Sequence, residues 1–136
     1  MEPRGIRNNN PLNIRKGNNW KHERHPQKDK TFEEFESMEY GIRAGFILLR
    51  NYITGYGGRL RPYNTIEKII CRWAPPTENA TVRYIDFVCK DTGIDKRTPV
   101  RFTDRPTMCA IVNAMIFVEC GQRVSLEVIQ SAYDLV

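Results

Sequence analysis

A single carboxyl group, that of Glu119, stands where an apolar helical face ends in this 136-residue sequence. The apolar residues Met108, Val112 and Met115 share the spacing of one helix face. Glu119 continues that spacing and lies in the last turn before Gly121. Apolar surroundings and the negative end of the helix dipole both raise the pKa of a carboxyl, which a general acid needs near neutral pH. The alternative interpretation is an exposed glutamate beside a glycine that caps the helix.

An asparagine-rich segment near the N-terminus holds the second group of candidate residues. Asn8, Asn9 and Asn10 precede Pro11, a run that excludes a helix interior and favours a structured loop. Asparagine amides both donate and accept hydrogen bonds, which is the chemistry that holds sugar hydroxyl and acetamido groups. The alternative is a turn whose amides satisfy only its own backbone, and composition alone favours that alternative.

The formal net charge of +5 lies entirely in the N-terminal segment. Residues 1–30 contain eight Lys and Arg against three Asp and Glu, whereas the remaining residues contain thirteen of each. Such a segment suits a polyanion, a class that includes nucleic acid, an anionic membrane surface and an anionic cell wall. A solvated basic loop explains the same charge. Because no DNA- or RNA-binding motif accompanies the basic residues, nucleic acid is the least favoured partner.

The composition, 40% hydrophobic and 27% charged, is typical of a globular protein. No apolar run approaches the roughly 20 residues that a membrane-spanning helix needs, and the N-terminus lacks the apolar region of a secretory signal. We therefore expect synthesis in the cytoplasm without a signal peptide. The segment from His22 to His25 does not have the spacing of a zinc motif, and the cysteines form no CxxC pair. We expect neither a metal nor a cofactor.

Five segments carry apolar residues at the helical period, approximately residues 39–55, 65–74, 80–93, 104–121 and 126–136. Glycines at 55, 57 and 58, at 93 and at 121 are expected to stop three of these helices. Pro75 and Pro76 are expected to end another. The expected N-terminal caps are Thr65, Asn79 and Ser125, and Thr103 and Asp104 are expected to introduce the helix that ends at Gly121.

The remaining N-terminal part is expected to be mostly irregular. Leu12–Arg15 and Lys30–Ser37 have the character of short strands, which allows at most a short β-hairpin, and the spacing of Phe32 and Phe35 also suits a helical turn. The predicted fold class is therefore mainly α (α+β). We expect a single domain over residues 1–136, with a basic, Asn- and Pro-rich arm at 1–30 and a helical body at 31–136.

Two long motifs resemble a family of small phage virion proteins and phage-derived bacterial proteins. The first is RGIRNNNPLNIR at residues 4–15, followed by Trp20, and the second is WAPPTENATVRYI at residues 73–85. The FEEF segment at 32–35 and GIRA at 41–44 lie between them as in that family. The resemblance covers roughly residues 4–121, with Leu12 where glycine is common. It implies a virion structural protein related to the lysozyme-like superfamily.

Three segments carry the lysozyme-like resemblance. Residues 10–15 with Trp20 resemble a segment that lies in the glycan cleft of bacterial glucosaminidases. Residues 78–85 resemble a lytic transglycosylase segment whose tyrosine, here Tyr84, lies near the catalytic carboxyl; a partly buried aromatic residue is the alternative. Residues 114–121 resemble the motif that holds this carboxyl, here Glu119. In the superfamily that motif comes first, so one explanation, a hypothesis, is a circularly permuted lysozyme-like fold.

The resemblance implies a phage or prophage virion-associated protein that cleaves β-1,4 glycan strands of peptidoglycan, as lytic transglycosylases and lysozymes do. A mechanism with two carboxylates needs a second one, for which Glu39 and Asp86 are weak candidates. A transglycosylase-like route needs only one and is simpler. The expected catalytic residues are Glu119 and Tyr84, and the expected substrate-binding residues are Arg7, Asn8, Asn9, Asn10, Asn13, Arg15 and Trp20.

Two other functions remain open at this point. A non-catalytic virion structural or cell-wall-binding protein would share the fold and the origin, and it is favoured by the lack of a catalytic helix before the Asn-rich segment. Nucleic-acid binding by the basic arm is the third function. The expected partners are glycan strands and other virion proteins. The expected location is the virion, or the cell wall after release from a bacterial cytoplasm.

Overall fold

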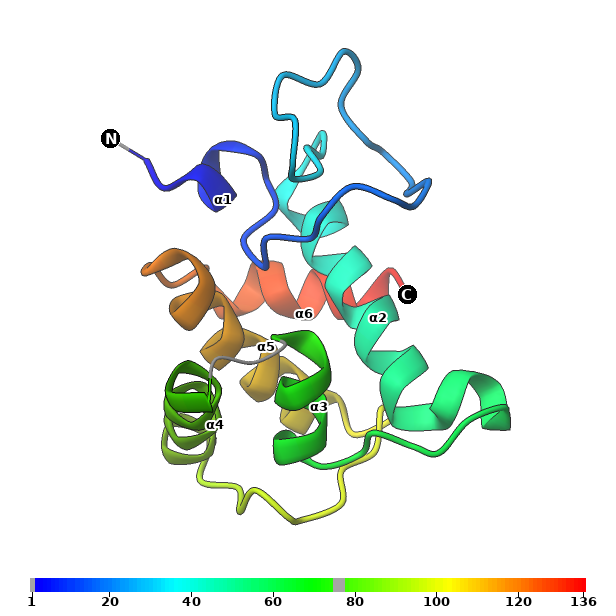
Figure 1. The fold of residues 1–136 in the computed structure, drawn as a ribbon. Coiled ribbons are helices and arrows are strands. Elements are labelled where there is room, and N and C mark those ends of the chain that lie inside the picture. Colours follow the sequence, from blue (N-terminus) through cyan, green and yellow to red (C-terminus); the bar gives the residue numbers. More distant parts are fainter. Residues whose placement is uncertain (1, 75–77) are drawn as a thin grey trace.

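The computed structural model describes residues 2–74 and 78–136, the side chains of residues 78 and 79 excepted. The described residues form six helices and no sheet, which confirms the prediction of a mainly helical fold (Figure 1). The expected hairpin is reduced to two isolated bridges, Arg15 to Phe32 and Glu23 to Phe35. The helices are α1 Arg4–Arg7, α2 Met38–Gly58, α3 Ile66–Trp73, α4 Glu78–Thr92, α5 Arg105–Cys120 and α6 Leu126–Asp134.

The helix ends follow the capping residues that the sequence offers. The side chains of Thr65, Asp104 and Ser125 each accept a hydrogen bond from a backbone N–H in the first turn, as expected. Gly93 and Gly121 have positive φ angles and end α4 and α5, as predicted. Helix α4 begins at Glu78 rather than after Asn79. The expected stop at Pro75 and Pro76 lies outside the described residues.

The regular part of α2 ends within its glycine cluster, as the sequence predicts. Gly55, Tyr56 and Gly57 all have left-handed backbone angles, so the chain turns there before it enters the loop to α3. Leu60 then donates its N–H to the carbonyl of Gly55 and closes the turn. Tyr52, which precedes this turn in α2, contacts Trp73 at the end of α3.

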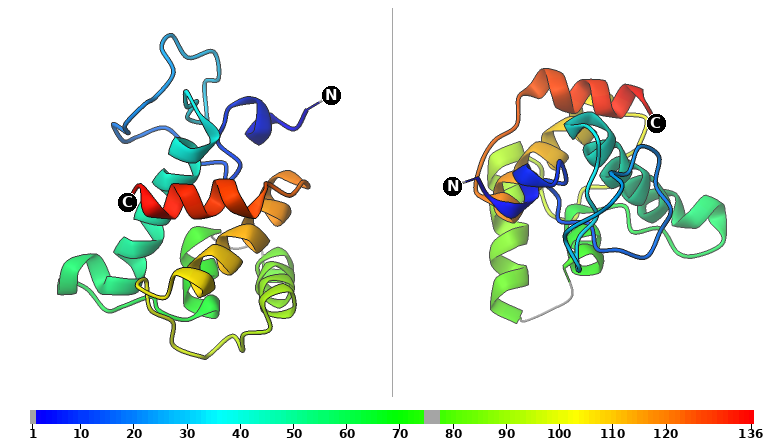
Figure 2. Two further views of the ribbon diagram at one scale, coloured as in Figure 1. Left: turned by 180° about the vertical axis from the view of Figure 1, so that it is seen from behind. Right: turned by 90° about the horizontal axis from the view of Figure 1, so that it is seen from above.

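Helix α5 lies at the centre of the helical body, and it packs against α4, α6, α2 and α1 (Figures 1 and 2). Its predicted apolar face is buried, because Met108, Val112 and Met115 are fully shielded from solvent. This burial confirms the spacing argument that places Glu119 at the end of a core-facing stripe.

The N-terminal arm is packed against the helical body. Figure 1 shows residues 8–37 looping over the N-terminal end of α2, at the far end of the molecule from the loop of residues 93–104. Leu12, Ile14 and Phe35 are buried in the core. Gly41 and Gly45 of α2 allow the arm backbone at Asn9 and the Leu12 side chain to approach this helix closely.

Candidate functional site

A cleft of about 400 Å³ opens where the arm meets the ends of α3 and α5. The arm forms one wall, α2 and the end of α3 form another, and the last turn of α5 supplies a carboxyl group. Sites for small ligands commonly combine such aromatic and apolar walls with a few polar groups. The lining residues are Leu12, Asn13, Ile14, Arg15, Asn18, Phe32, Leu48, Tyr52, Trp73, Ala74 and Glu119.

The Glu119 carboxyl is held by groups from three other parts of the chain. The Tyr84 hydroxyl of α4 donates to Oε2 at 2.9 Å. The Asn13 amide donates to Oε1 at 3.3 Å and to the Glu119 carbonyl at 3.1 Å. A hydrogen bond from the Trp73 side chain further stabilises the charged form. Four segments that are distant in sequence therefore converge on one carboxyl.

Burial raises the pKa of the Glu119 carboxyl above its usual range. The hydrogen bonds from Tyr84, Asn13 and Trp73 favour the anion and oppose this shift without cancelling it. The site thus combines a carboxyl that retains its proton more readily than usual with donors that stabilise the carboxylate once the proton has left. This combination is the one that a general acid requires.

Local structure fixes the two groups that hold Glu119. Tyr84 is 6% exposed, and burial beside the carboxylate holds the pKa of its hydroxyl far above the usual range, so this hydroxyl remains a donor. Asn13 has a φ of 53°, a left-handed conformation that asparagine tolerates, and its backbone N–H bonds to the carbonyl of Asn10. The Asn-rich turn therefore aims the Asn13 amide at the end of α5.

Two of the expected substrate-binding residues line this cleft, Asn13 and Arg15. Asn10 is fully buried, and its side chain bonds to the backbone of Ile14 and Glu33. The Asn9 amide donates to the carbonyl of Phe35. Both amides satisfy the backbone of the arm, which is the alternative that composition favoured.

The other expected residues lie elsewhere. Arg7 and Asn8 line a second, separate cavity, where the Asn8 amide donates to Asp29. Trp20 does not line the cleft that contains Glu119. Its backbone N–H donates to the Glu23 carboxyl, and its indole nitrogen is buried without a partner among the described residues. Of the expected site residues, Glu119, Tyr84, Asn13 and Arg15 therefore lie together. The other expected substrate-binding residues lie apart from them.

Tyr52 and Trp73 form an aromatic wall of the cleft that no sequence pattern predicted. Tyr52 and Trp73 contact each other edge to face, with ring centroids 6.3 Å apart, and both line the cleft. The helical spacing of Tyr52 and Trp73 is equally typical of core-facing residues, so spacing alone does not indicate a cleft wall. Beside them, the guanidinium of Arg72 lies over the rings of Tyr52 and Tyr63, a contact that only the folded chain brings together.

Glu119 is the only carboxylate among the described residues that line the cleft. Neither Glu39 nor Asp86, the candidates for a second carboxyl, belongs to this lining. Within the part of the chain that the structure describes, no group of three or more acidic, histidine or cysteine side chains could hold a metal ion. The described part of the cleft therefore offers one acidic group, Glu119, together with the hydrogen-bond donors that hold it.

A second carboxyl with a raised pKa, that of Glu33, lies inside the arm. Its side chain is 3% exposed, and burial together with the neighbouring Glu23 raises its pKa to about 7 from an ordinary 4.5. The folded protein therefore binds the Glu33 proton more tightly than the unfolded chain does. Its stability contribution is complete below the ordinary pKa and is lost as the pH rises towards 7.

We expect the Glu33→Gln substitution to remove this loss of stability at rising pH. The wild-type free energy of unfolding should fall by roughly 3 kcal/mol between pH 4.5 and 7 from this group, because each pKa unit is worth about 1.4 kcal/mol. The variant should show a flatter pH dependence in denaturant unfolding. Glu36→Gln, at an exposed position of the same segment, is the control and should keep the wild-type slope. Parallel curves for wild type and Glu33→Gln would contradict the assignment.

No protein-family model matches the chain. The chain is 44% identical over 122 residues to Protein P5 of Pseudoalteromonas phage PM2, and the match covers 87% of this chain and 71% of that protein. The chain therefore belongs to the family of this phage protein. No helix in the described part of the chain is long and apolar enough to span a membrane.

Proposed function

We propose that this protein is a virion-associated phage protein that cleaves the β-1,4 glycan strand of peptidoglycan at the Glu119 cleft. The kinship with a phage protein supports the virion association. The observation that carries the proposed activity is the carboxyl of Glu119, which has a raised pKa and accepts hydrogen bonds from Tyr84 and Asn13 inside a cleft with aromatic walls. The lysozyme-like resemblance of the sequence supports the same residue as the acid.

In the proposed mechanism, protonated Glu119 donates its proton to the glycosidic oxygen while the bond from that oxygen to the anomeric carbon breaks. The glycan fragment that held this oxygen leaves with a new hydroxyl group. The Glu119 carboxylate then removes the proton from a hydroxyl of the remaining sugar, whose oxygen closes a ring onto the anomeric carbon. This route uses a single carboxyl twice, in agreement with the cleft lining that the structure describes.

The surrounding residues have distinct proposed roles. Tyr84 and Asn13 are positioning residues, because they hold the carboxyl and stabilise its anion between the two proton transfers. The rings of Tyr52 and Trp73 offer apolar surface to sugar rings. Arg15 and Asn18 at the cleft edge offer donors to hydroxyl and acetamido groups.

Tyr84→Phe should move the alkaline limb of the pH–activity profile to higher pH. The Tyr84 hydroxyl lowers the pKa of Glu119, so its removal raises that pKa further and keeps the acid protonated over a wider range. The measurement is the initial rate of sacculus solubilisation as a function of pH. A purely structural role for Tyr84 would lower the rate at every pH and leave the limb in place, which would contradict the assignment.

Product analysis tests the proposed function itself. Purified protein is incubated with purified sacculi, and the soluble fragments are identified by mass spectrometry. The proposal predicts glycan fragments that end in an anhydro sugar, one water lighter than the hydrolysis product and without a reducing end. Hydrolytic products with reducing ends would support glycan cleavage as the activity but would exclude the single-carboxyl mechanism. Absence of any soluble fragment would overturn the proposed activity.

A non-catalytic structural or wall-binding component of the virion is the second candidate. It is favoured by the kinship with a phage protein and by the lack of a second carboxylate among the described cleft residues. Co-sedimentation with sacculi distinguishes the two functions. Binding that is lost in Trp73→Ala, without any release of fragments by the wild type, would support this candidate.

A further inference from the structure

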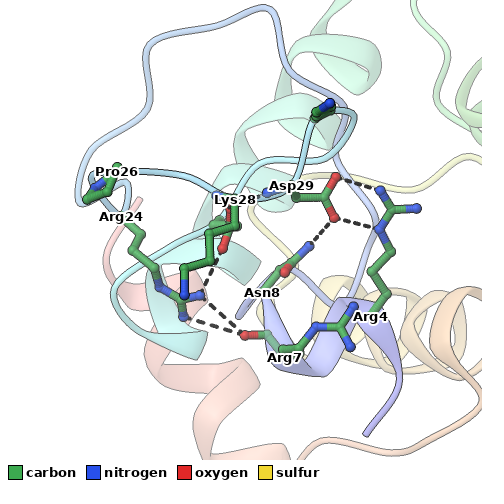
Figure 3. A pocket seen from close by; sticks show the side chains of 9 residues that line it. Arg4, Arg7, Asn8, Arg24, Pro26, Lys28 and Asp29 are labelled. Carbon is green, nitrogen blue, oxygen red and sulfur yellow. Dashed lines mark hydrogen bonds and ion pairs between the residues drawn. The ribbon is translucent and has the colours of Figure 1, made fainter.

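A second cavity, of about 830 Å³, lies between α1 and the loop of the arm (Figure 3). Among the described residues, none lines both this cavity and the Glu119 cleft. Figure 3 shows Arg4 and Arg7 on one side, with Arg24 and Lys28 on the loop across from them. Its lining residues are Arg4, Arg7, Asn8, Arg24, Pro26, Lys28, Asp29, Lys30 and Glu34.

Both carboxylates of this cavity are already satisfied by the arm itself. Asp29 accepts two hydrogen bonds from Arg4, one from Asn8 and two from backbone N–H groups. Glu34 accepts from Arg24 and from the backbone N–H groups of Lys28 and Asp29. These contacts hold the pKa values of Asp29 and Glu34 below their usual ranges, so both groups remain ionised and serve as internal supports.

Three cations of the cavity are left for a ligand. Within the described residues, no carboxylate lies within ion-pair distance of the side chains of Arg7, Lys28 or Lys30. All three are exposed, whereas the two arginines that hold Asp29 and Glu34 are fixed in place. Five cationic and two anionic side chains therefore leave the cavity with a formal charge of +3. Concentrated positive charge in a concave site attracts and orients anions.

We propose that this cavity binds a compact anion bearing two or more phosphate charges, such as a diphosphate or a phosphomonoester group. Guanidinium groups match the geometry of phosphate oxygens, and lysines supply further point charges. None of the described residues that line the cavity is aromatic, so it offers no ring on which bases could stack, and its charge is gathered in one hollow. These features favour a compact phosphate group over a nucleic-acid strand. Phosphate binding in this cavity does not depend on catalysis at Glu119.

The test is calorimetric titration of the full chain with sodium pyrophosphate, together with sedimentation of vesicles that contain phosphatidic acid. The site variant is Arg7→Ala/Lys28→Ala/Lys30→Ala, whose three positions are exposed and leave the Asp29 and Glu34 contacts intact. The control removes the same charge elsewhere with Lys68→Ala/Lys90→Ala/Arg101→Ala, at three exposed positions outside the cavity.

The proposal predicts that the site variant loses at least tenfold in affinity while the control stays within about threefold of wild type. Binding of pyrophosphate indicates a soluble phosphate ligand, and binding of vesicles alone indicates a lipid headgroup; either result supports the site if the site variant loses it. Equal losses in the two variants, or no binding in either assay, would overturn the proposal. So would variant-sensitive binding confined to a DNA duplex.

Discussion

Glu119→Gln is expected to lower the rate of glycan cleavage by about 10²–10⁴-fold, the range that a positioned general acid contributes. The amide cannot donate a proton to the glycosidic oxygen, yet its carbonyl can still accept the hydrogen bond from Tyr84. The variant removes a carboxyl whose ionisation burial disfavours, so its free energy of unfolding at pH 7 should not fall. The assay is the release of soluble fragments from labelled sacculi.

The matched control is Glu127→Gln, which removes one carboxylate from the exposed first turn of α6. This variant should keep the wild-type rate. Binding to intact sacculi should be the same for wild type and Glu119→Gln, because the change removes a proton donor and leaves the cleft walls in place. A Glu119→Gln variant that retains the wild-type rate would contradict the assignment of the acid.

Gly41→Ala is expected to cause the largest loss of stability among the single changes considered. A Cβ atom at residue 41 would lie 1.7 Å from the carbonyl oxygen of Asn9, a backbone atom that can move only with the arm. Overpacking of this kind typically costs about 1–3 kcal/mol and occasionally more, and we expect the upper end here. The Asn-rich segment that contains Asn9 also carries Asn13, whose amide donates to the Glu119 carboxyl. The Gly41→Ala variant should therefore also have a lower rate of glycan cleavage.

Gly45→Ala, one turn further along α2, is the matched comparison for this prediction. Its Cβ atom would lie 2.2 Å from Cδ1 of Leu12, the end of a side chain that can change its rotamer. Denaturant unfolding should therefore rank the proteins as wild type, Gly45→Ala and Gly41→Ala in order of decreasing stability. Equal stability of wild type and Gly41→Ala would show that the arm does not press against α2 as described.

The sequence predicts the helical body well because its signals are local. Apolar spacing and capping residues define α3, α5 and α6, and the same spacing brings Glu119 to the end of a buried stripe. The contact between Tyr84 and Glu119 spans 35 residues, and only the resemblance to lytic transglycosylases suggested it.

The arm was predicted less well because its contacts are not local. The Asn8 side chain bonds to Asp29, 21 residues away, and that of Asn10 bonds to Glu33, 23 residues away. An asparagine that supports a turn and one that binds a sugar look the same in a sequence. For the same reason, helical spacing did not distinguish Trp73 as a cleft wall from Trp73 as a core residue.

Inside the cleft, Glu119 holds its proton more tightly than an ordinary carboxyl does. The most direct test is a ¹³C NMR titration of protein labelled at the glutamate carboxyl groups, with Glu119→Gln used to assign the resonance. We expect a midpoint above the ordinary value of 4.5 for Glu119, and a further rise in Tyr84→Phe. A Glu119 midpoint at or below 4.5 would contradict it.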